Sequence, residues 1–251
     1  MRFLIYANDF YQTYKRGVAN YGFNLINALK SNGHQVYIYS TSNIKLSKKQ
    51  YKIYSNQVAI TNELLKEIIY YGDYKPIIKS NFFIRIKKFF NYIQILFSNN
   101  ELIKYQISKE QKIFIGNEFI NWDGFYNDNL FKLKDWLSRR LRIPIKIKVP
   151  ESIDYVISIS PQNIKTYGSP LISIFHDVIP FIDPNHLEEN SRQAAIRYSA
   201  AIKNSNKNLY ISHEVGNELQ KIFFNQFNKN SSIKPEFLGQ PILSTEDILN
   251  H

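Results

Sequence analysis

Apolar and polar residues alternate along both ends of this chain in the rhythm of buried strands and amphipathic helices. Residues 2–7 are mostly apolar and predict a short buried strand. A helix follows a loop, because apolar side chains recur there at helical spacing: Val18, Tyr21, Leu25, Ile26 and Leu29. Gly33 is expected to end this helix in a left-handed conformation, and residues 36–39 predict a second strand.

The second half repeats this alternation. Residues 154–160, 171–175, 208–211 and about 235–238 predict strands. Residues 188–204 predict a helix, and Ser212 is expected to cap another that carries Val215, Leu219 and Ile222. Strands that alternate with helices indicate an α/β protein with a Rossmann-like, doubly wound and mostly parallel sheet.

The middle of the chain is less regular. Residues 57–60 and 112–116 are strand candidates, and helices are expected at 62–69, 81–97 and 128–141. We expect one domain over residues 1–240, in which 41–150 form a variable middle region, and a linker that starts at 241–251.

Composition narrows the class of partner. The chain has 32 Lys and Arg against 21 Asp and Glu, a net charge of +11, which favours anionic partners such as nucleotides, phosphorylated carriers or acidic membranes. No cysteine is present, which excludes disulfides and thiolate metal sites. The absence of a signal peptide and of a long apolar segment predicts a cytoplasmic protein. Nucleic acid is not an expected partner, since the basic residues are scattered and no recognised binding module is present.

The segment 171–180 carries the strongest chemical signal. A predicted buried strand ends there in His176 and Asp177, and ligands of open α/β sheets bind at the carboxyl edge of the strands. His176 could contact a bound sugar or phosphate, while Asp177 shapes the loop or meets acceptor hydroxyls. The alternative is structural: Asp177 forms a turn before Pro180, and His176 is a hydrogen-bonded residue at the rim.

A second candidate site lies after the first strand, at the start of the first helix, in residues 15–20. A helix start presents free N–H groups and the positive end of its dipole, which suits a phosphate. Gly17 would allow close approach of a ligand, and Lys15 or Arg16 would add charge. The alternative is an ordinary loop glycine beside a solvated arginine.

Residues 82–93 combine basic and aromatic side chains. They predict either a helix at a membrane interface, which would bring the protein to the inner face of the membrane, or a helix packed on the sheet with a basic outer face. No metal site is expected, because the five histidines lack ligand spacing, and no serine lies in a nucleophile elbow.

Four segments, in order, resemble the N-terminal half of retaining GT-B glycosyltransferases of the family usually numbered four, also described as glycosyl transferases group 1. Residues 1–36 resemble its first strand, glycine loop, first helix and second strand, and 175–180 (FHDVIP) resemble its hydrophobic-His-Asp-Leu-Ile-Pro element. Residues 211–219 are similar to its Ile-Ser-Glu turn, and 233–239 to the strand that leads into its second domain.

This resemblance implies a function. The donor diphosphate would lie against Arg16, Gly17, Asn20 and Ser212, and His176 and Asp177 would line the site of transfer. A hexose would pass with retention from a UDP- or GDP-linked sugar to a glycan or lipid-linked acceptor, without a cofactor or an obligatory metal, in the synthesis of surface polysaccharide or glycolipid. The family often has two glycines where this chain has only Gly17.

The family also holds its donor in a C-terminal domain, which we do not expect within these residues. The alternative is therefore a non-catalytic, truncated or split GT-B domain that binds an acceptor or docks to a separate donor-domain chain. A reading of the gene beyond the codon for His251 discriminates between the two: an in-frame or adjacent donor domain favours the enzyme.

Overall fold

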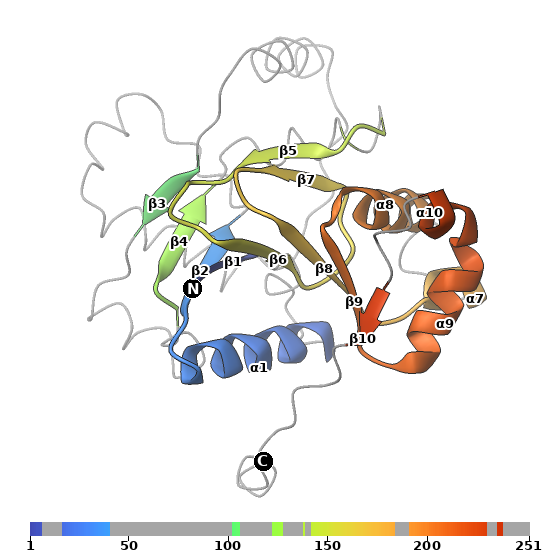
Figure 1. Ribbon diagram of the computed structural model, residues 1–251, viewed down its shortest axis with the longest axis horizontal. Coiled ribbons are helices and arrows are strands. Elements are labelled where there is room, and N and C mark those ends of the chain that lie inside the picture. Colours follow the sequence, from blue (N-terminus) through green and yellow to red (C-terminus); the bar gives the residue numbers. More distant parts are fainter. Residues whose placement is uncertain are drawn as a thin grey trace, which may run out of the picture.

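Strands alternate with helices near the two ends of the described chain, whereas the elements described between them are strands, as Figure 1 shows. The computed structural model describes residues 1–6, 17–40, 102–105, 122–127, 138, 142–183, 191–229 and 235–237. Its strands are β1 (Arg2–Tyr6), β2 (Gln35–Ser40), β3 (Ile103–Tyr105), β4 (Gly124–Asn127), β5 (Ile145–Lys148), β6 (Tyr155–Ser158), β7 (Ile164–Tyr167), β8 (Leu171–Phe175), β9 (Lys207–Tyr210) and β10 (Pro235–Phe237). Its helices are α1 (Gly17–Ser31), α7 (Ile179–Ile182), α8 (Ser191–Asn204), α9 (His213–Ile222) and α10 (Phe224–Lys229).

Eight of these strands form one sheet in the order β10-β9-β8-β6-β1-β2-β4-β3. Every neighbouring pair is parallel except β3 and β4, which are antiparallel. The remaining two, β5 and β7, form a small parallel sheet of their own. The prediction of a Rossmann-like, mostly parallel α/β sheet is therefore confirmed.

Helix α1 covers one face of the large sheet (Figure 1). The core on this face joins its buried residues to alternate residues of the central strands, among them Ile26, Phe3, Ile5, Ile38 and Ile174. The helix ends where the sequence predicted: Gly33 has a φ of 77°, and the His34 amide donates to the Leu29 carbonyl over 3.1 Å.

Asp123 fixes the carboxyl end of α1 to the sheet. Its carboxylate accepts hydrogen bonds from Lys30 Nζ at 2.6 and 2.7 Å and from the backbone amide of Val36 at 2.6 Å. The neighbouring residue, Trp122, is 1% exposed and belongs to the core beneath α1. A half-buried ion pair that also satisfies a strand amide holds helix and sheet in one orientation.

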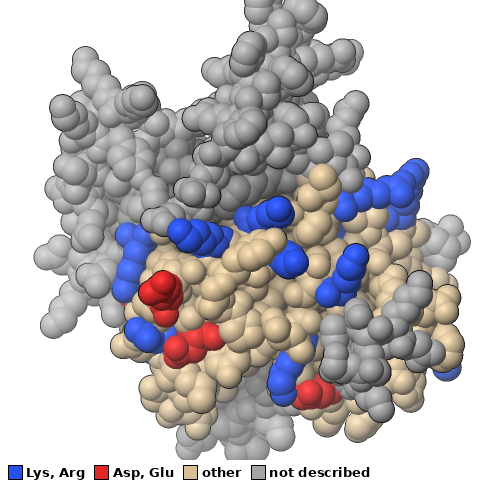
Figure 2. All heavy atoms as spheres, turned by 45° about the horizontal axis from the view of Figure 1, so that its top comes forward, with Lys and Arg blue, Asp and Glu red and all other residues tan. Residues whose placement is uncertain are grey.

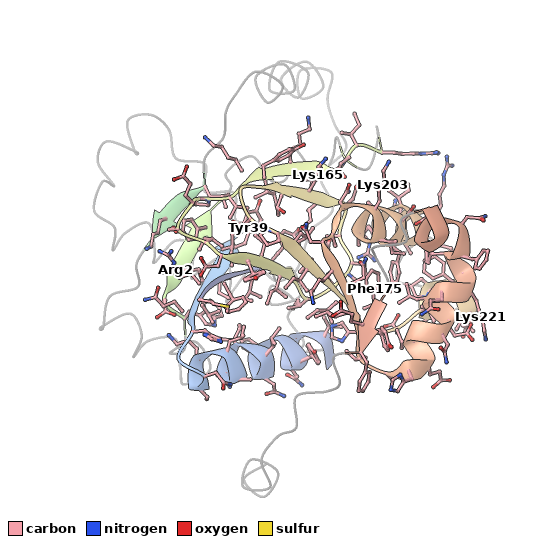
Figure 3. The ribbon with its side chains drawn as sticks, in the orientation of Figure 1. Arg2, Tyr39, Lys165, Phe175, Lys203 and Lys221 are labelled. Carbon is pink, nitrogen blue, oxygen red and sulfur yellow. The ribbon has the colours of Figure 1, made fainter. Side chains whose placement is uncertain are left out.

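The opposite face carries two layers. Over β1 and β2 lies the β5–β7 sheet, whose Ile145, Ile147 and Ile164 pack against Leu4 and Tyr37. Over the end of β8 lie α8 and α9, which pack against Phe175, a residue at the junction of sheet and helices in Figure 3.

Small and polar side chains occupy the part of this face between those two layers. Ser158, Ser173 and Asn208 are paired across β6, β8 and β9, and all three are fully buried. Ser173 Oγ lies 2.6 Å from Ser205 Oγ, and Ser158 Oγ donates to the Ser160 carbonyl over 2.7 Å. The small serines leave room for α8, which turns Ala194 and Ala201 inward.

Most of the elements expected at the two ends of the chain are confirmed: β1, β2, β6, β8, β9, β10, α1, α8 and α9. Not predicted were β3, β4, β5, β7, α7 and α10. These elements have only three to six residues, too few for a hydrophobic period to stand out. The segments expected at 57–60, 62–69, 81–97 and 112–116 lie outside the described residues, as does 128–141 apart from the helical residue Ser138.

Gly216 provides a test of how α9 packs on β9. A Cβ atom at this position would lie 2.8 Å from the ring of Tyr210, which itself contacts Phe237. We expect Gly216→Ala to lower the free energy of unfolding by about 1–3 kcal/mol through overpacking, as measured by urea denaturation. The control is Gly17→Ala, where a Cβ would meet no atom within 4 Å; equal unfolding midpoints for the two variants would contradict this packing.

Candidate functional site

The direction in which successive strands are added to the large sheet reverses beside β1. The chain passes from β1 through α1 to β2 on one side, whereas β6, β8, β9 and β10 continue on the other. Between β1 and β6, Tyr6 pairs with Ser158 at the carboxyl ends of the two strands. In open α/β sheets, ligands bind outside the carboxyl ends of the strands at such a reversal.

His176 lies at this edge, directly after β8. Its Nε2 is 2.7 Å from the carbonyl oxygen of Ile159, the residue that follows β6. Because a carbonyl can only accept, Nε2 carries the proton and donates it. The imidazole also meets the Tyr21 ring edge to face, with centroids 4.7 Å apart and an angle of 85°. His176 is therefore held in one orientation between the end of β6 and the first turns of α1.

Tyr21 forms the apolar side of this arrangement. Its side chain is 8% exposed, and burial raises the pKa of its hydroxyl from 10.0 to about 12. The pKa rises because desolvation penalises the phenolate, and the hydroxyl is neutral at physiological pH. A neutral, largely buried phenol beside His176 makes this part of the edge less aqueous than an open surface.

Asp177 has a structural role in this loop. Its Oδ1 accepts the backbone amide of Ile179 over 3.2 Å, and its carbonyl accepts the hydroxyl of Tyr198 over 2.9 Å. The carboxylate thereby stabilises the turn into the short helix α7, with Pro180 in its first turn. Asp177 thus forms a turn, which is one of the two roles that the sequence suggested for it. The other role, a contact between its carboxylate and an acceptor hydroxyl, stays a prediction.

The predicted phosphate site falls partly within the described chain. Gly17 is the first residue of α1 and Asn20 lies in its first turn, both exposed, while Arg16 lies outside the described residues. Tyr21, next to Asn20, contacts His176, so the start of α1 and the end of β8 meet at one edge. Gly17 makes no close packing contact that would require a glycine. Its role with a diphosphate stays a prediction.

Ser212 lies at the same edge, beyond the neighbouring strand. Phe175 of β8 pairs with Tyr210 of β9, and the Ile211 amide donates to the Phe175 carbonyl over 3.3 Å. Ser212 Oγ accepts the Val215 amide over 3.3 Å and so caps α9, as predicted. A ligand bound to Ser212 Oγ would therefore contact an oxygen that already accepts the Val215 amide.

Sequence reasoning missed a polar loop after β6. Ser160 Oγ accepts a hydrogen bond from Gln162 Nε2 over 2.9 Å, and the Ser160 carbonyl accepts the Ser158 hydroxyl. Arg197 of α8 donates to the Pro161 carbonyl over 3.0 Å. This loop could have been predicted from its position in the chain. Residues 160–162 come soon after a predicted strand, and ligands of open α/β sheets bind at the carboxyl ends of strands where the strand order reverses.

Within the described ranges, no three His, Asp or Glu side chains come together as a group that could hold a metal ion. Among the same residues, no helix is both long enough and apolar enough to cross a membrane.

No family model matches this chain, and no curated protein sequence matches it significantly. The class of the protein therefore comes from its fold: a mostly parallel, Rossmann-like α/β sheet with His176 at its carboxyl edge.

Tyr21 gives a pH-dependent test of this geometry. Its pKa is raised on folding, so the stabilisation that it contributes is complete below pH 10 and is lost as the pH rises towards 12. We compare the wild type with Tyr21→Phe, which keeps the ring, by denaturant unfolding at a series of pH values. The stability of the wild type relative to the variant should decrease between pH 10 and 12.

The control for this series is Tyr167→Phe, which removes a hydroxyl from an exposed ring. Parallel stability curves for the wild type and Tyr21→Phe across the alkaline range would show that the Tyr21 hydroxyl is not buried beside His176.

Proposed function

We propose that this chain is the N-terminal, acceptor-side domain of a retaining GT-B glycosyltransferase of the family usually numbered four. Its substrates are a UDP- or GDP-linked hexose and a glycan or lipid-linked acceptor, in the synthesis of surface polysaccharide or glycolipid. The observation that carries the proposal is the position of His176, at the carboxyl edge of β8, hydrogen-bonded to Ile159 and packed against Tyr21 of α1.

The start of α1 supports the donor side of this proposal. Helix α1 begins at Gly17 and has fifteen residues, and its first N–H groups lack partners within the helix. A diphosphate leaving group gains charge as the glycosidic bond to the sugar breaks, and a helix start stabilises such charge. Asn20 and the neighbouring Arg16 would contribute further hydrogen-bond donors.

The fixed tautomer of His176 supports its place near the sugar. Nε2 donates to the Ile159 carbonyl, so the ring has a set direction in the absence of ligand. A preoriented side chain can bind the hydroxyls of a transferred hexose without reorganisation. Asp177, held by the Ile179 amide, keeps this loop in place and has the remaining carboxylate oxygen to offer to an acceptor hydroxyl.

A transfer assay tests the proposal. Purified chain is incubated with radiolabelled UDP-glucose or GDP-mannose and with membranes of the source cell, which supply an acceptor and any partner chain. We expect label to enter lipid or polysaccharide only when the chain is present. His176→Ala should lower the rate by about 10²-fold or more if the imidazole takes part in proton transfer or sugar binding.

The matched control is His34→Ala. His34 precedes β2 at the amino end of the sheet, where its ring contacts Phe3, so this variant removes a histidine from the opposite edge. A thermal unfolding curve of each variant excludes loss of fold. The proposal fails if the chain transfers no hexose, or if His176→Ala and His34→Ala have the same rate.

A further inference from the structure

A groove with a volume of about 500 Å³ lies along α8, between this helix and the segment that leads into β5. Its polar lining is basic or neutral: Arg142, Arg192 and Lys203 carry the charge, with Asn163, Ser199 and Asn204 beside them. Side chains such as Ile196 and Pro144 provide apolar walls. None of the described residues that line the groove is acidic.

Arg142 reaches this groove from a strained backbone position. In the described part of the chain it is the one non-glycine residue with a positive φ, of 55°. This conformation costs an ordinary residue about 1–2 kcal/mol. Strain of this kind is concentrated at functional sites, where the surrounding structure holds it.

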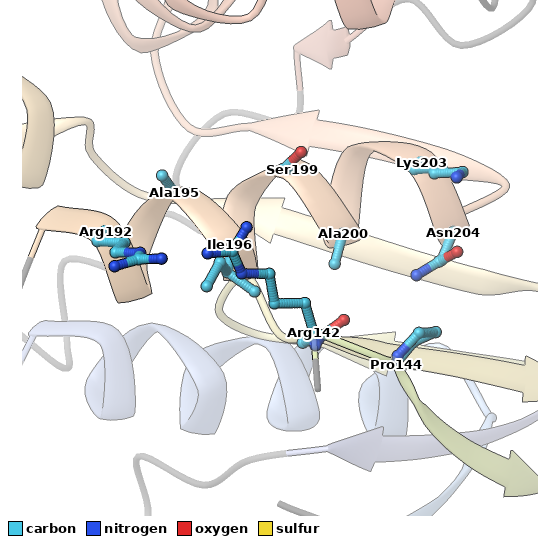
Figure 4. A pocket seen from close by; sticks show the side chains of 10 residues that line it. Arg142, Pro144, Arg192, Ala195, Ile196, Ser199, Ala200, Lys203 and Asn204 are labelled. Carbon is cyan, nitrogen blue, oxygen red and sulfur yellow. The ribbon is translucent and has the colours of Figure 1, made fainter. Parts of the chain in front are cut away.

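Two hydrogen bonds hold the segment of Arg142 in place. Asn163 Nδ2 donates to the Ile143 carbonyl over 3.3 Å, and the Ile145 amide donates to the Asn163 carbonyl over 2.8 Å. From there the Arg142 side chain runs across Ile196 towards Arg192, while Lys203 lies at the other end of the groove (Figure 4). Two guanidinium groups from distant parts of the chain thus converge at one end.

Two of the three positive charges that line the groove, those of Arg142 and Lys203, form no ion pair with an acidic residue of the described chain. The ion pairs between described residues are Arg2–Asp154, Lys30–Asp123, Lys207–Glu236 and Lys221–Glu218. Exposed lysines extend the positive surface over β5 and β7, namely Lys146, Lys148 and Lys165. Figure 2 shows Lys and Arg side chains over this face with few Asp and Glu among them, and Figure 3 shows Lys165 and Lys203 on β7 and α8.

From this geometry we infer that the groove along α8 binds an organic phosphate, with Arg142 and Arg192 on the phosphate group. Planar guanidinium groups present paired donors that match phosphate oxygens. The Ser199 hydroxyl, which accepts a hydrogen bond from Gln226 over 2.7 Å, adds a polar group to the lining. Ile196 and Pro144 contact the carbon part, and Lys203 attracts a second anionic group.

This site is separate from the one at the carboxyl edge. Helix α8 packs on the face of the sheet that carries Phe175, whereas Tyr21 and Ile159, the contacts of His176, belong to the core beneath α1. The inference therefore does not depend on the proposed transferase activity, and each can fail alone.

Binding to the purified chain tests the inference, with glycerol 1-phosphate as the soluble probe and isothermal titration calorimetry as the readout. We expect saturable binding of one ligand per chain. The double variant Arg142→Gln/Arg192→Gln should weaken it about tenfold or more, because it removes charge-assisted hydrogen bonds. The matched control is Lys146→Gln/Lys165→Gln, which removes the same charge from β5 and β7 outside the groove and should change affinity about twofold at most.

Arg142→Gly separates binding from folding. Glycine adopts a positive φ at low cost, so this variant should unfold at the same or a higher urea concentration while it loses affinity for glycerol 1-phosphate. Retained affinity in Arg142→Gly, or equal losses in the groove and control double variants, would overturn the inference.

Vesicles distinguish a free phosphate ester from a lipid headgroup. The chain is sedimented with phosphatidylcholine vesicles that contain or lack phosphatidylglycerol. Sedimentation that requires phosphatidylglycerol and is abolished by Arg142→Gln/Arg192→Gln assigns the groove to a headgroup, whereas binding of the soluble probe alone assigns it to a free ester. If neither probe binds, or if binding of both probes survives the double variant, the groove is not a phosphate site.

Discussion

The central position of β1 is the constraint on which the rest of the fold depends. It pairs in parallel with β2 on one edge and with β6 on the other, and Leu4, Ile5 and Tyr6 are almost completely buried. A strand with both edges and both faces occupied must be apolar throughout, as these residues are. Since parallel neighbours cannot be reached by tight turns, the chain must leave the sheet after β1 and return by crossovers. The two directions of return create the reversal of strand order at which His176 lies.

The two faces of the sheet present different chemistry. Beneath α1, large apolar side chains fill the core up to Tyr21 and Ile159, and these two contact His176 at the carboxyl edge. On the other face, Ser158, Ser173 and Asn208 admit α8 closely, and the outer side of that helix meets the β5 segment at a basic groove. The site around His176 therefore lies beside α1, and the basic groove lies along α8 on the opposite face of the sheet.

The sequence predicted the features that depend on local order. His176 and Ser212 each follow an apolar strand, so their place at the carboxyl edge follows from strand direction alone, and Ser212 signals a helix cap by its type. The hydrogen bond of His176 to Ile159 was not predictable, because it joins residues 17 positions apart through the β6–β8 pairing. The groove was missed for a similar reason. Arg142 and Arg192 converge only because the β5–β7 layer packs beside α8, and the four-residue strands of that layer give a weak signal.

The ends of the large sheet bear on how this protein behaves at high concentration. The last strand on one side, β3, and the last on the other, β10, have three residues each, and β10 begins with Pro235, which has no N–H to offer. A long, regular outer strand would be a template for a strand of another molecule, whereas a short one with a proline gives few hydrogen bonds in register. The described part of the sheet is therefore broad enough across its middle to bury a core, while its outermost described strands offer few hydrogen bonds to a strand of another molecule.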